Sequence, residues 1–368
     1  MLSSSNQSLP AESNLSCFLY GPGDARFEEK PVPSIGHDSH DVLLRIAYTG
    51  VCGSDVHFWL HGGINEKVRP GAPMVLGHEA TGVVVAVGDR VTTLIAGDQV
   101  ALEPGFPCRH CSFCLSGKYN FCRGMTFAAS PGPGPVAHGT LSQFFVLPED
   151  FCYKLPKHIS LDQGALMEPL AVAIHASRLV DIRPGHSVVV FGAGTVGLLA
   201  CAVAREFGAA KAIAVDINVD RLQFAKNFAA TATYTANTTL DANDNAKMLK
   251  DTLLPDGADI IIEATGVASS IQSGIHVIKQ GGSYVQVGLG KPKIEFPIVE
   301  MSEKEIKMMG CFRYGSGDFA LALSLLERKR IDVRKLITKT VPFEAAVDAW
   351  ETAKRGEGIK TLIQVQQL

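Results

Sequence analysis

Short, mostly hydrophobic runs recur between polar, turn-forming positions in the first hundred residues of the chain. Residues 42–48 and 80–87 are examples, bounded by clusters of Gly, Pro and Asp. Short β-type runs separated by turn-forming residues are typical of a β-rich domain. This part of the chain is therefore predicted to form a β-rich, barrel-like domain.

The pattern changes at about Ser187, where apolar runs begin to alternate with helix-like segments. Residues 188–191 predict a strand, residues 198–207 a helix and residues 212–215 a second strand, with a glycine-rich turn after the first strand. The alternation continues through strand candidates at residues 259–263 and 283–287, with a turn expected at Gly281-Gly282. Repeated strand–helix alternation indicates an α/β domain with a doubly wound parallel sheet.

The C-terminal segment is expected to leave this second domain. Helix-like residues at 320–327 and 343–353 precede an apolar strand candidate at 360–365. We expect that strand to return to the first domain, because nothing parallel remains for it to join. With 368 residues the chain can bury two cores. The predicted division is a β-rich domain at 1–169, a dinucleotide-binding domain at 170–310 and a return segment at 311–368.

Composition narrows the class of protein. The chain is 46% hydrophobic and 19% charged with a formal net charge of -3, which does not favour nucleic acid as a partner. No apolar run reaches the roughly 20 residues that span a bilayer, and the polar N-terminus lacks a signal-peptide core. We therefore expect a soluble, cytoplasmic protein without a membrane partner.

A glycine motif marks a candidate nucleotide site. Gly192, Gly194 and Gly197 form a GxGxxG directly after a predicted strand and before a predicted helix, where backbone can approach a pyrophosphate. Asp216 ends the next strand, where its carboxylate would bind ribose hydroxyls and repel a 2′-phosphate. Arg221 leaves an NADP reading open, because a guanidinium could hold that phosphate. NAD is the favoured cofactor.

Four cysteines in one loop indicate a metal. Their spacing, C-x2-C-x2-C-x7-C, suits tetrahedral zinc and leaves no open coordination position, so this zinc is expected to be structural. Iron–sulfur ligation is the alternative. The residues are Cys108, Cys111, Cys114 and Cys122.

A second candidate metal site is dispersed. Cys52 lies 26 positions before His78, which Glu79 follows directly. One sulfur, one imidazole and one carboxylate suit a catalytic zinc with an open position, where the metal acts as a Lewis acid on an alcohol. Ser54 and His57 could carry away the alcohol proton, although Ser54 could instead cap a helix.

These residues together resemble the medium-chain zinc alcohol dehydrogenase family over nearly the whole chain. The resemblance rests on residues 77–88 and 97–100, the four-cysteine loop and the GxGxxG, in that order. It implies a GroES-like catalytic domain and a Rossmann domain. Residues 52–59, 167–172 and 312–315 are most similar to the polyol branch. That branch implies that Cys52, His78 and Glu79 bind zinc, with Glu168 beside it, either directly or through an intervening water.

The resemblance also assigns binding residues. Substrate contacts are implied for Phe58, Glu168, Arg313 and Tyr314. Cofactor contacts are implied for Gly192, Gly194, Val196, Gly197, Asp216, Arg221, Val287, Gly288, Leu289, Cys311, Phe312 and Arg313. Animal sorbitol dehydrogenases commonly carry Tyr at the position of Phe58 and lack the full four-cysteine loop, so the chain departs from that subgroup.

The function implied is an NAD-linked oxidoreductase with one catalytic and one structural zinc per chain. It would oxidise xylitol to D-xylulose by hydride transfer and form a homotetramer. Sorbitol or L-arabinitol dehydrogenases of the same branch are the alternatives within the enzyme class. A nucleotide-binding protein without enzymatic activity is the alternative of another class, because a fold does not determine a function.

Overall fold

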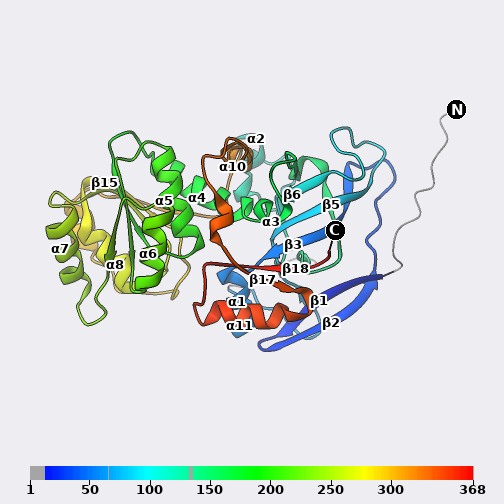
Figure 1. Ribbon diagram of the computed structural model, residues 1–368, viewed down its shortest axis with the longest axis horizontal. Helices are drawn as coiled ribbons and strands as arrows, with labels where there is room; N and C mark the ends of the chain where they lie inside the picture. The colour runs from blue at the N-terminus through cyan, green and yellow to red at the C-terminus, as the bar shows by residue number, and fades with distance from the viewer. Residues whose placement is uncertain (1–12, 65, 132–135, 368) are drawn as a thin grey trace. The chain divides into compact units, whose positions relative to one another are not determined.

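The computed structural model describes residues 13–64, 66–131 and 136–367. The polar N-terminal segment considered for targeting lies, up to residue 12, outside the described residues. The chain divides into two compact units (Figure 1). Unit 1 contains residues 1–108, 123–168 and 337–368, and unit 2 contains residues 109–122 and 169–336.

Unit 1 is built mainly from antiparallel strands. In its described residues the main sheet has the order β10-β6-β5-β3-β18-β17, with β9 beside β3, and a second sheet has the order β2-β1-β4. The strands are β1 (Ser13–Gly21), β2 (Asp24–Pro31), β3 (Asp41–Gly50), β4 (Met74–Val75), β5 (Glu79–Val87), β6 (Gln99–Leu102), β7 (Gly105–Phe106), β8 (Thr126–Phe127), β9 (Phe144–Pro148), β10 (Cys152–Lys154), β17 (Ile337–Pro342) and β18 (Lys360–Gln364). The helices are α1 (Gly53–His61), α3 (Leu161–Gly164) and α11 (Ala346–Lys354), with 3-10 turns η2 (Glu149–Phe151) and η4 (Phe343–Ala345).

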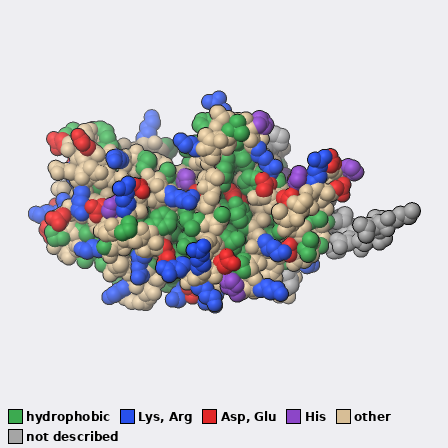
Figure 2. All heavy atoms as spheres, turned by 90° about the horizontal axis from the view of Figure 1, so that it is seen from above, with side chains coloured by type: hydrophobic (Ala, Val, Ile, Leu, Met, Phe, Trp, Pro, Cys, Tyr) green, Lys and Arg blue, Asp and Glu red, His purple; other side chains and the backbone are tan. Residues whose placement is uncertain are grey.

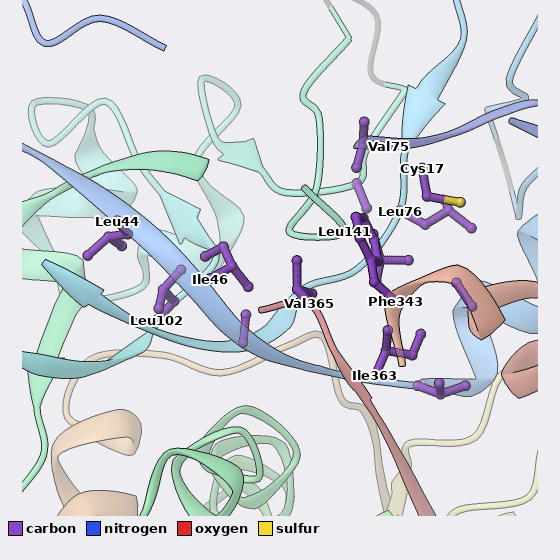
Figure 3. Close-up of a cluster of buried hydrophobic side chains, with 14 of the residues drawn as sticks. Cys17, Leu44, Ile46, Val75, Leu76, Leu102, Leu141, Phe343, Ile363 and Val365 are labelled. Atoms are coloured by element: carbon purple, nitrogen blue, oxygen red, sulfur yellow. The ribbon is translucent and has the colours of Figure 1, made fainter. Parts of the chain in front are cut away.

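The core of unit 1 brings distant parts of the chain together (Figure 3). Cys17 from β1, Ile46 from β3 and Ile363 from β18 are each no more than 1% exposed. Burying such side chains contributes about 1.5–3 kcal/mol each. The expected return of the last strand is confirmed, since β18 pairs antiparallel with β3.

Unit 2 contains a parallel sheet in the order β13-β12-β11-β14-β15-β16 within the described chain. This is the doubly wound order of a Rossmann domain. Its strands are β11 (Ser187–Phe191), β12 (Lys211–Asp216), β13 (Ala232–Thr235), β14 (Ala258–Glu263), β15 (Ile278–Gln286) and β16 (Lys307–Gly310). Its helices are α2 (Ser112–Leu115), α5 (Thr195–Glu206), α6 (Val219–Phe228), α7 (Ala242–Leu253), α8 (Ala268–Val277), α9 (Ile298–Glu303) and α10 (Asp318–Glu327), with η1 (Tyr119–Phe121) and η3 (Val333–Leu336). Helix α4 (Met167–Leu179) begins in unit 1 and continues in unit 2.

Helices cover both faces of the parallel sheet. Figure 1 shows α5 and α6 on one side of the strands and α7 and α8 on the other. The central strand β11 is almost entirely apolar, and its Val188, Val189 and Val190 are fully buried. Strands buried on both faces read as continuous hydrophobic runs, which is the pattern that predicted them.

Three expectations differ from the structure. Residues 311–336 belong to unit 2, whereas the return was expected to begin at residue 311, because α10 and η3 continue that unit's fold. Strand β17, which was not expected, pairs in parallel with β18. Gly281 lies inside β15 with a φ of 70°, so the expected turn is an irregularity within one strand.

The described surface is mixed in charge. On the face seen in Figure 2, Lys and Arg side chains are interspersed with Asp and Glu side chains. In the described residues, none of the helices has the length and apolarity needed to cross a membrane.

Candidate active site

Cys52 and His78 both lie beside one buried carboxylate, that of Asp55. Cys52 precedes α1, and its backbone N–H donates to Asp55 Oδ2 at 2.9 Å. The other oxygen, Asp55 Oδ1, lies 3.9 Å from His78 Nδ1. Asp55 is 2% exposed, so its carboxylate is shielded from solvent and interacts only with neighbouring protein groups. It therefore hydrogen-bonds the start of the helix and lies near the histidine that precedes β5.

Glu79 begins β5 and is paired with a lysine from the far end of the chain. Lys360 Nζ donates to the two carboxylate oxygens at 2.9 and 2.6 Å, and to Val51 O at 2.9 Å. Glu79 is 1% exposed and Lys360 is 2% exposed. Gly50 lies opposite Glu79 in the sheet, and a Cβ there would collide with Glu79 Oε2. The glycine therefore makes room for the carboxylate.

The three predicted ligands come together in the folded chain. One ligand atom each from Cys52, His78 and Glu79 lies within 4.8 Å of the others. Sulfur, imidazole nitrogen and carboxylate oxygen at such separations fit a tetrahedral zinc, and three protein ligands leave a fourth position open. Glu168, on the first turn of α4, is buried near the same groups but does not belong to this set of three.

Electrostatics also favour a cation at this cluster. Burial, together with the charges of Glu79 and Cys52 and against the opposing effect of His78, raises the pKa of Glu168 to about 8. Burial, Glu79 and Asp55 likewise raise the pKa of the Cys52 thiol to about 11. Burial opposes the charge on Lys360, but Glu79 and Cys52 raise the pKa of its ammonium group. Several acidic groups thus lie beside a single ammonium group, and ionisation of one makes ionisation of the others less favourable. A bound divalent cation would stabilise their anionic forms.

The other predicted residues of α1 differ in their surroundings. Ser54 and His57 are partly exposed and are spaced three residues apart, so they share one face of the helix. Phe58, expected to contact substrate, is 8% exposed and belongs to the hydrophobic core of unit 1.

The four cysteines of the loop also converge. Their sulfur atoms lie within 4.8 Å of one another, and Cys111 Sγ is 3.4 Å from Cys114 Sγ. Cys111 precedes the short helix α2, and Cys122 follows η1. The donor set of four sulfurs fits zinc without an open position.

The glycine motif has the geometry of a dinucleotide turn. Gly192 has a φ of 99°, which a side chain would strain. A Cβ at Gly197 would collide with Gly192 O, so helix α5 can pack on the turn only with glycine there. Gly194 precedes α5 and has open space where its Cβ would lie, while Val196 is partly exposed. A phosphate can therefore approach the positive N-terminal end of helix α5.

Asp216 lies at the carboxyl end of β12, next to this turn. Its Oδ2 accepts from Ala193 N at 2.7 Å, and its Oδ1 accepts from Asn218 N at 2.9 Å. Asn218 caps α6 and thereby fixes the turn that carries Arg221. The aspartate thus joins the glycine motif to the next helix.

The residues expected at the cofactor and substrate lie in two further segments of unit 2. Val287 and Gly288 follow β15, and both N–H groups donate to Glu263 O. In the second segment, the Arg313 guanidinium lies 4.7 Å from the centre of the exposed Phe312 ring, and Cys311 N donates to Gln286 O.

Tyr314 differs from Arg313 and Phe312 in being buried. Its side chain is 2% exposed and packs edge-on against Phe319, with ring centroids 4.9 Å apart. The segment is also attached to the cysteine loop, because Tyr119 Oη donates to Gly315 O at 3.2 Å and Asn120 Nδ2 donates to Phe312 O at 3.2 Å.

Sequence reasoning missed Asp55, Lys360 and Glu263. Lys360 is 281 positions from its partner, a separation at which spacing carries no information. The one hint in the sequence was the position of this lysine, which is the first residue of an otherwise apolar strand candidate. Asp55 and Glu263 are buried carboxylates, and only the tertiary structure shows what they bind.

Comparison with known proteins identifies the family. Residues 38–157 match the alcohol dehydrogenase GroES-like domain, and residues 195–328 match the zinc-binding dehydrogenase domain. "Probable D-xylulose reductase A" of Aspergillus fumigatus is 52% identical over 359 residues, covering 97% of this chain and 98% of that protein. "D-xylulose reductase A" of Aspergillus oryzae is 51% identical over 350 residues, covering 95% and 96%.

Solved structures agree with this assignment. L-idonate 5-dehydrogenase from Escherichia coli superposes with a TM-score of 0.87 at 28% identity, covering 96% of this chain and 98% of that one. Galactitol-1-phosphate dehydrogenase from Escherichia coli gives 0.84 at 28%, covering 95% and 99%. The chain belongs to the medium-chain, zinc-binding alcohol dehydrogenase family.

Proposed function

We propose that this protein interconverts xylitol and D-xylulose by hydride transfer to and from NAD. The observation that carries the proposal is the near full-length identity of 51–52% to proteins named D-xylulose reductase A. The buried set of Cys52, His78 and Glu79 supports it, because it supplies the ligands that such chemistry requires.

Two zinc ions per chain are proposed, with different roles. Cys52, His78 and Glu79 would hold the catalytic ion, with Glu168 beside it, and the four cysteines of the loop would hold a structural ion. When bound at the first site, zinc polarises the substrate oxygen and makes the hydroxyl proton easier to remove. The second site offers thiolates at all four positions and leaves no place for substrate.

The chain's own groups would order the substrate and move its proton. Ser54 and His57 share one face of α1, which supports a path for the hydroxyl proton toward solvent. Glu168, buried beside the proposed zinc ligands, would hydrogen-bond a substrate hydroxyl. Arg313 would donate to further hydroxyls of a polyol. The buried ring of Tyr314 would act by holding that segment in place.

NAD is proposed over NADP on the strength of Asp216. Its carboxylate lies at the end of β12, where the adenosine ribose binds in this fold, and a 2′-phosphate would meet its negative charge. A related dehydrogenase from Sinorhizobium meliloti was solved with NADP at 25% identity, so the family includes both preferences. Asp216→Ala should weaken NAD and relax discrimination against NADP.

Sorbitol and L-arabinitol remain candidate substrates, because the same ligand set serves any such polyol. A homotetramer in the cytoplasm is also proposed from the family resemblance, and sedimentation analysis would test the assembly. A nucleotide-binding protein without catalysis is disfavoured by the intact zinc ligands.

The test is a substrate panel with the purified protein. NAD or NADP reduction is followed with xylitol, sorbitol, L-arabinitol, ethanol and threonine at equal concentrations. The highest kcat/KM is expected with xylitol and NAD. Turnover confined to ethanol or threonine would contradict the polyol assignment, and no turnover with any alcohol would favour the binding protein.

A further inference from the structure

Glu263 is a fully buried carboxylate at the ligand-binding edge of the parallel sheet. It ends β14, which lies between β11 and β15. Glu263 is opposite Phe191 in the register, and Phe191 immediately precedes Gly192. In open parallel sheets, ligands bind outside the carboxyl ends of the strands. The residue is therefore next to the glycine turn, at the edge of the sheet where the cofactor is expected.

Neutral donors, and no cation, satisfy this carboxylate. Oε1 accepts from the Thr265 backbone N–H at 2.9 Å and from the Thr265 hydroxyl, while Oε2 accepts from Gly266 N at 2.8 Å and Gln286 Nε2 at 2.6 Å. Within residues 13–64, 66–131 and 136–367, no ion pair to Glu263 is formed. A buried charge is costly unless it is fully hydrogen-bonded, so these donors are held in place by it.

The hydrogen bonds of Glu263 join two loops. One loop, residues 264–267, follows β14, and the other, residues 287–290, follows β15. Gln286 Nε2 also donates to Gly288 O at 2.8 Å, and the Glu263 backbone oxygen accepts from Val287 N and Gly288 N at 2.8 and 2.9 Å. Both loops are therefore anchored to one residue.

The two loops approach each other so closely that their backbones leave no room for a side chain at two glycines. Gly266 has a φ of 73°, and its Cβ would lie 2.5 Å from the backbone of Leu289. A Cβ at Gly288 would in turn collide with Gly266 N. The apolar side chains of Val267 and Leu289 are 53% and 60% exposed at the ends of the two loops. The loops thus present a backbone surface with apolar edges, which suits the flat ring of a dinucleotide.

We propose that Glu263 is a positioning residue for the nicotinamide cofactor, acting through the loops at 264–267 and 287–290. The inference rests on the proposed function, in which Val287, Gly288 and Leu289 contact NAD. Removing the negative charge loosens the loops and weakens binding of the cofactor, while the proposed catalytic zinc ligands Cys52, His78 and Glu79, which belong to unit 1, keep their metal.

The same strand offers a matched control at its opposite end. Asp259 Oδ2 accepts from Ser187 N at 2.7 Å and from Ser187 Oγ at 2.6 Å, and Lys279 Nζ donates to Oδ1 at 2.9 Å. Asp259→Asn therefore disturbs a similar carboxylate network on β14, but far from the ligand-binding edge.

The experiment is an NADH titration of the full-length protein without polyol, followed by nicotinamide fluorescence. Zinc content and thermal unfolding are measured on the same samples. Glu263→Gln should raise the Kd for NADH about tenfold or more, because a donor replaces an acceptor facing Gly266 and Gln286. Asp259→Asn should change Kd less than about twofold even if it lowers the unfolding temperature.

Each outcome decides the proposal. An unchanged Kd in Glu263→Gln, or an equal loss in both variants, would overturn it. If Glu263→Gln does not fold, Gln286→Leu decides instead, since it removes one donor to the carboxylate and should also raise Kd; an unchanged Kd overturns the proposal. Failure of the wild-type protein to bind NADH at all would contradict the proposed function itself.

Discussion

The two cysteine-containing clusters of this protein are built in opposite ways. The four-cysteine loop takes all its donors from a segment of 15 residues, 108–122, and needs only a short helix and a 3-10 turn to close. The cluster of Cys52, His78 and Glu79 is assembled at the end of β3, the start of β5 and the start of α1, and its balancing ammonium comes from β18. One site depends on local geometry and the other on the whole sheet of unit 1.

Because the two clusters are built differently, we expect one to contribute to stability and the other to catalysis. A site closed on four thiolates can only bind metal and hold its loop, whereas a site with three ligands and buried surplus negative charge can bind a metal and a substrate. The dispersed site also adjoins Asp55, Lys360 and Glu168, which tune its charge. Substitutions in the two clusters should therefore fail in different ways.

The largest effect is expected at the dispersed cluster. Cys52→Ser or His78→Ala should lower kcat by about 10³-fold or more, because the Lewis acid contributes several kcal/mol to the barrier. NADH affinity should stay within about threefold of wild type, since the glycine motif and Asp216 belong to unit 2. Steady-state kinetics and NADH titration check this, and full activity in either variant would refute the catalytic assignment.

Lys360 tests whether the sheet supports that cluster. Lys360→Met leaves Glu79 buried without its cation, which should cost about 3–5 kcal/mol in the free energy of unfolding. It should also weaken zinc binding about 10–100-fold, as expected for a residue that orients a ligand.

Lys354→Met is the matched control for this lysine. Lys354 forms an exposed pair with Glu351 at 3.1 Å, which should contribute little to the free energy of unfolding because solvent screens it. Denaturant unfolding and zinc titration measure both variants, and equal behaviour of the two would show that the buried pair is unimportant.

The four-cysteine loop should respond in the reverse sense. Cys111→Ser should lower the unfolding temperature by about 5–10 °C while kcat changes less than about threefold, because this metal contributes folding free energy and does not touch substrate. Calorimetry measures the unfolding temperature, and steady-state kinetics measure kcat. A loss of kcat as deep as that of Cys52→Ser would abolish the distinction between the clusters.

The smallest effect contrasts two glutamates of unit 1. Burial raises the pKa of Glu168 to about 8, whereas at Glu149 burial is outweighed by hydrogen bonds from Thr93, His40 and Thr92, which lower the pKa from 4.5 to about 2. Because the folded pKa of Glu149 is depressed, its contribution to stability is complete above about pH 4.5 and is lost as pH falls toward 2. In Glu149→Gln the free energy of unfolding should therefore fall less steeply over that interval. Identical slopes in acid denaturation would show that Glu149 does not stabilise the fold.

The sequence predicted the elements whose signal is local. The glycine motif, strands β11, β12, β14 and β15, and the four-cysteine loop each carry their pattern within a few residues, and the structure contains them, whereas β13 and β16 were not predicted. Strand β17 escaped prediction because its exposed positions break the apolar pattern. The pairing of Lys360 with Glu79 and the hydrogen bonds of Glu263 depend on residues brought together by folding. Their roles depend on contacts between distant positions, which residue spacing in the sequence does not predict.

The most direct test of the central claim is the zinc content of three purified proteins, measured by elemental analysis. We expect two zinc ions per chain in the wild type and about one in each of Cys52→Ser and Cys111→Ser, with polyol turnover kept by Cys111→Ser and lost in Cys52→Ser. A wild-type protein with a single zinc that is lost in Cys111→Ser and kept in Cys52→Ser would contradict the catalytic site.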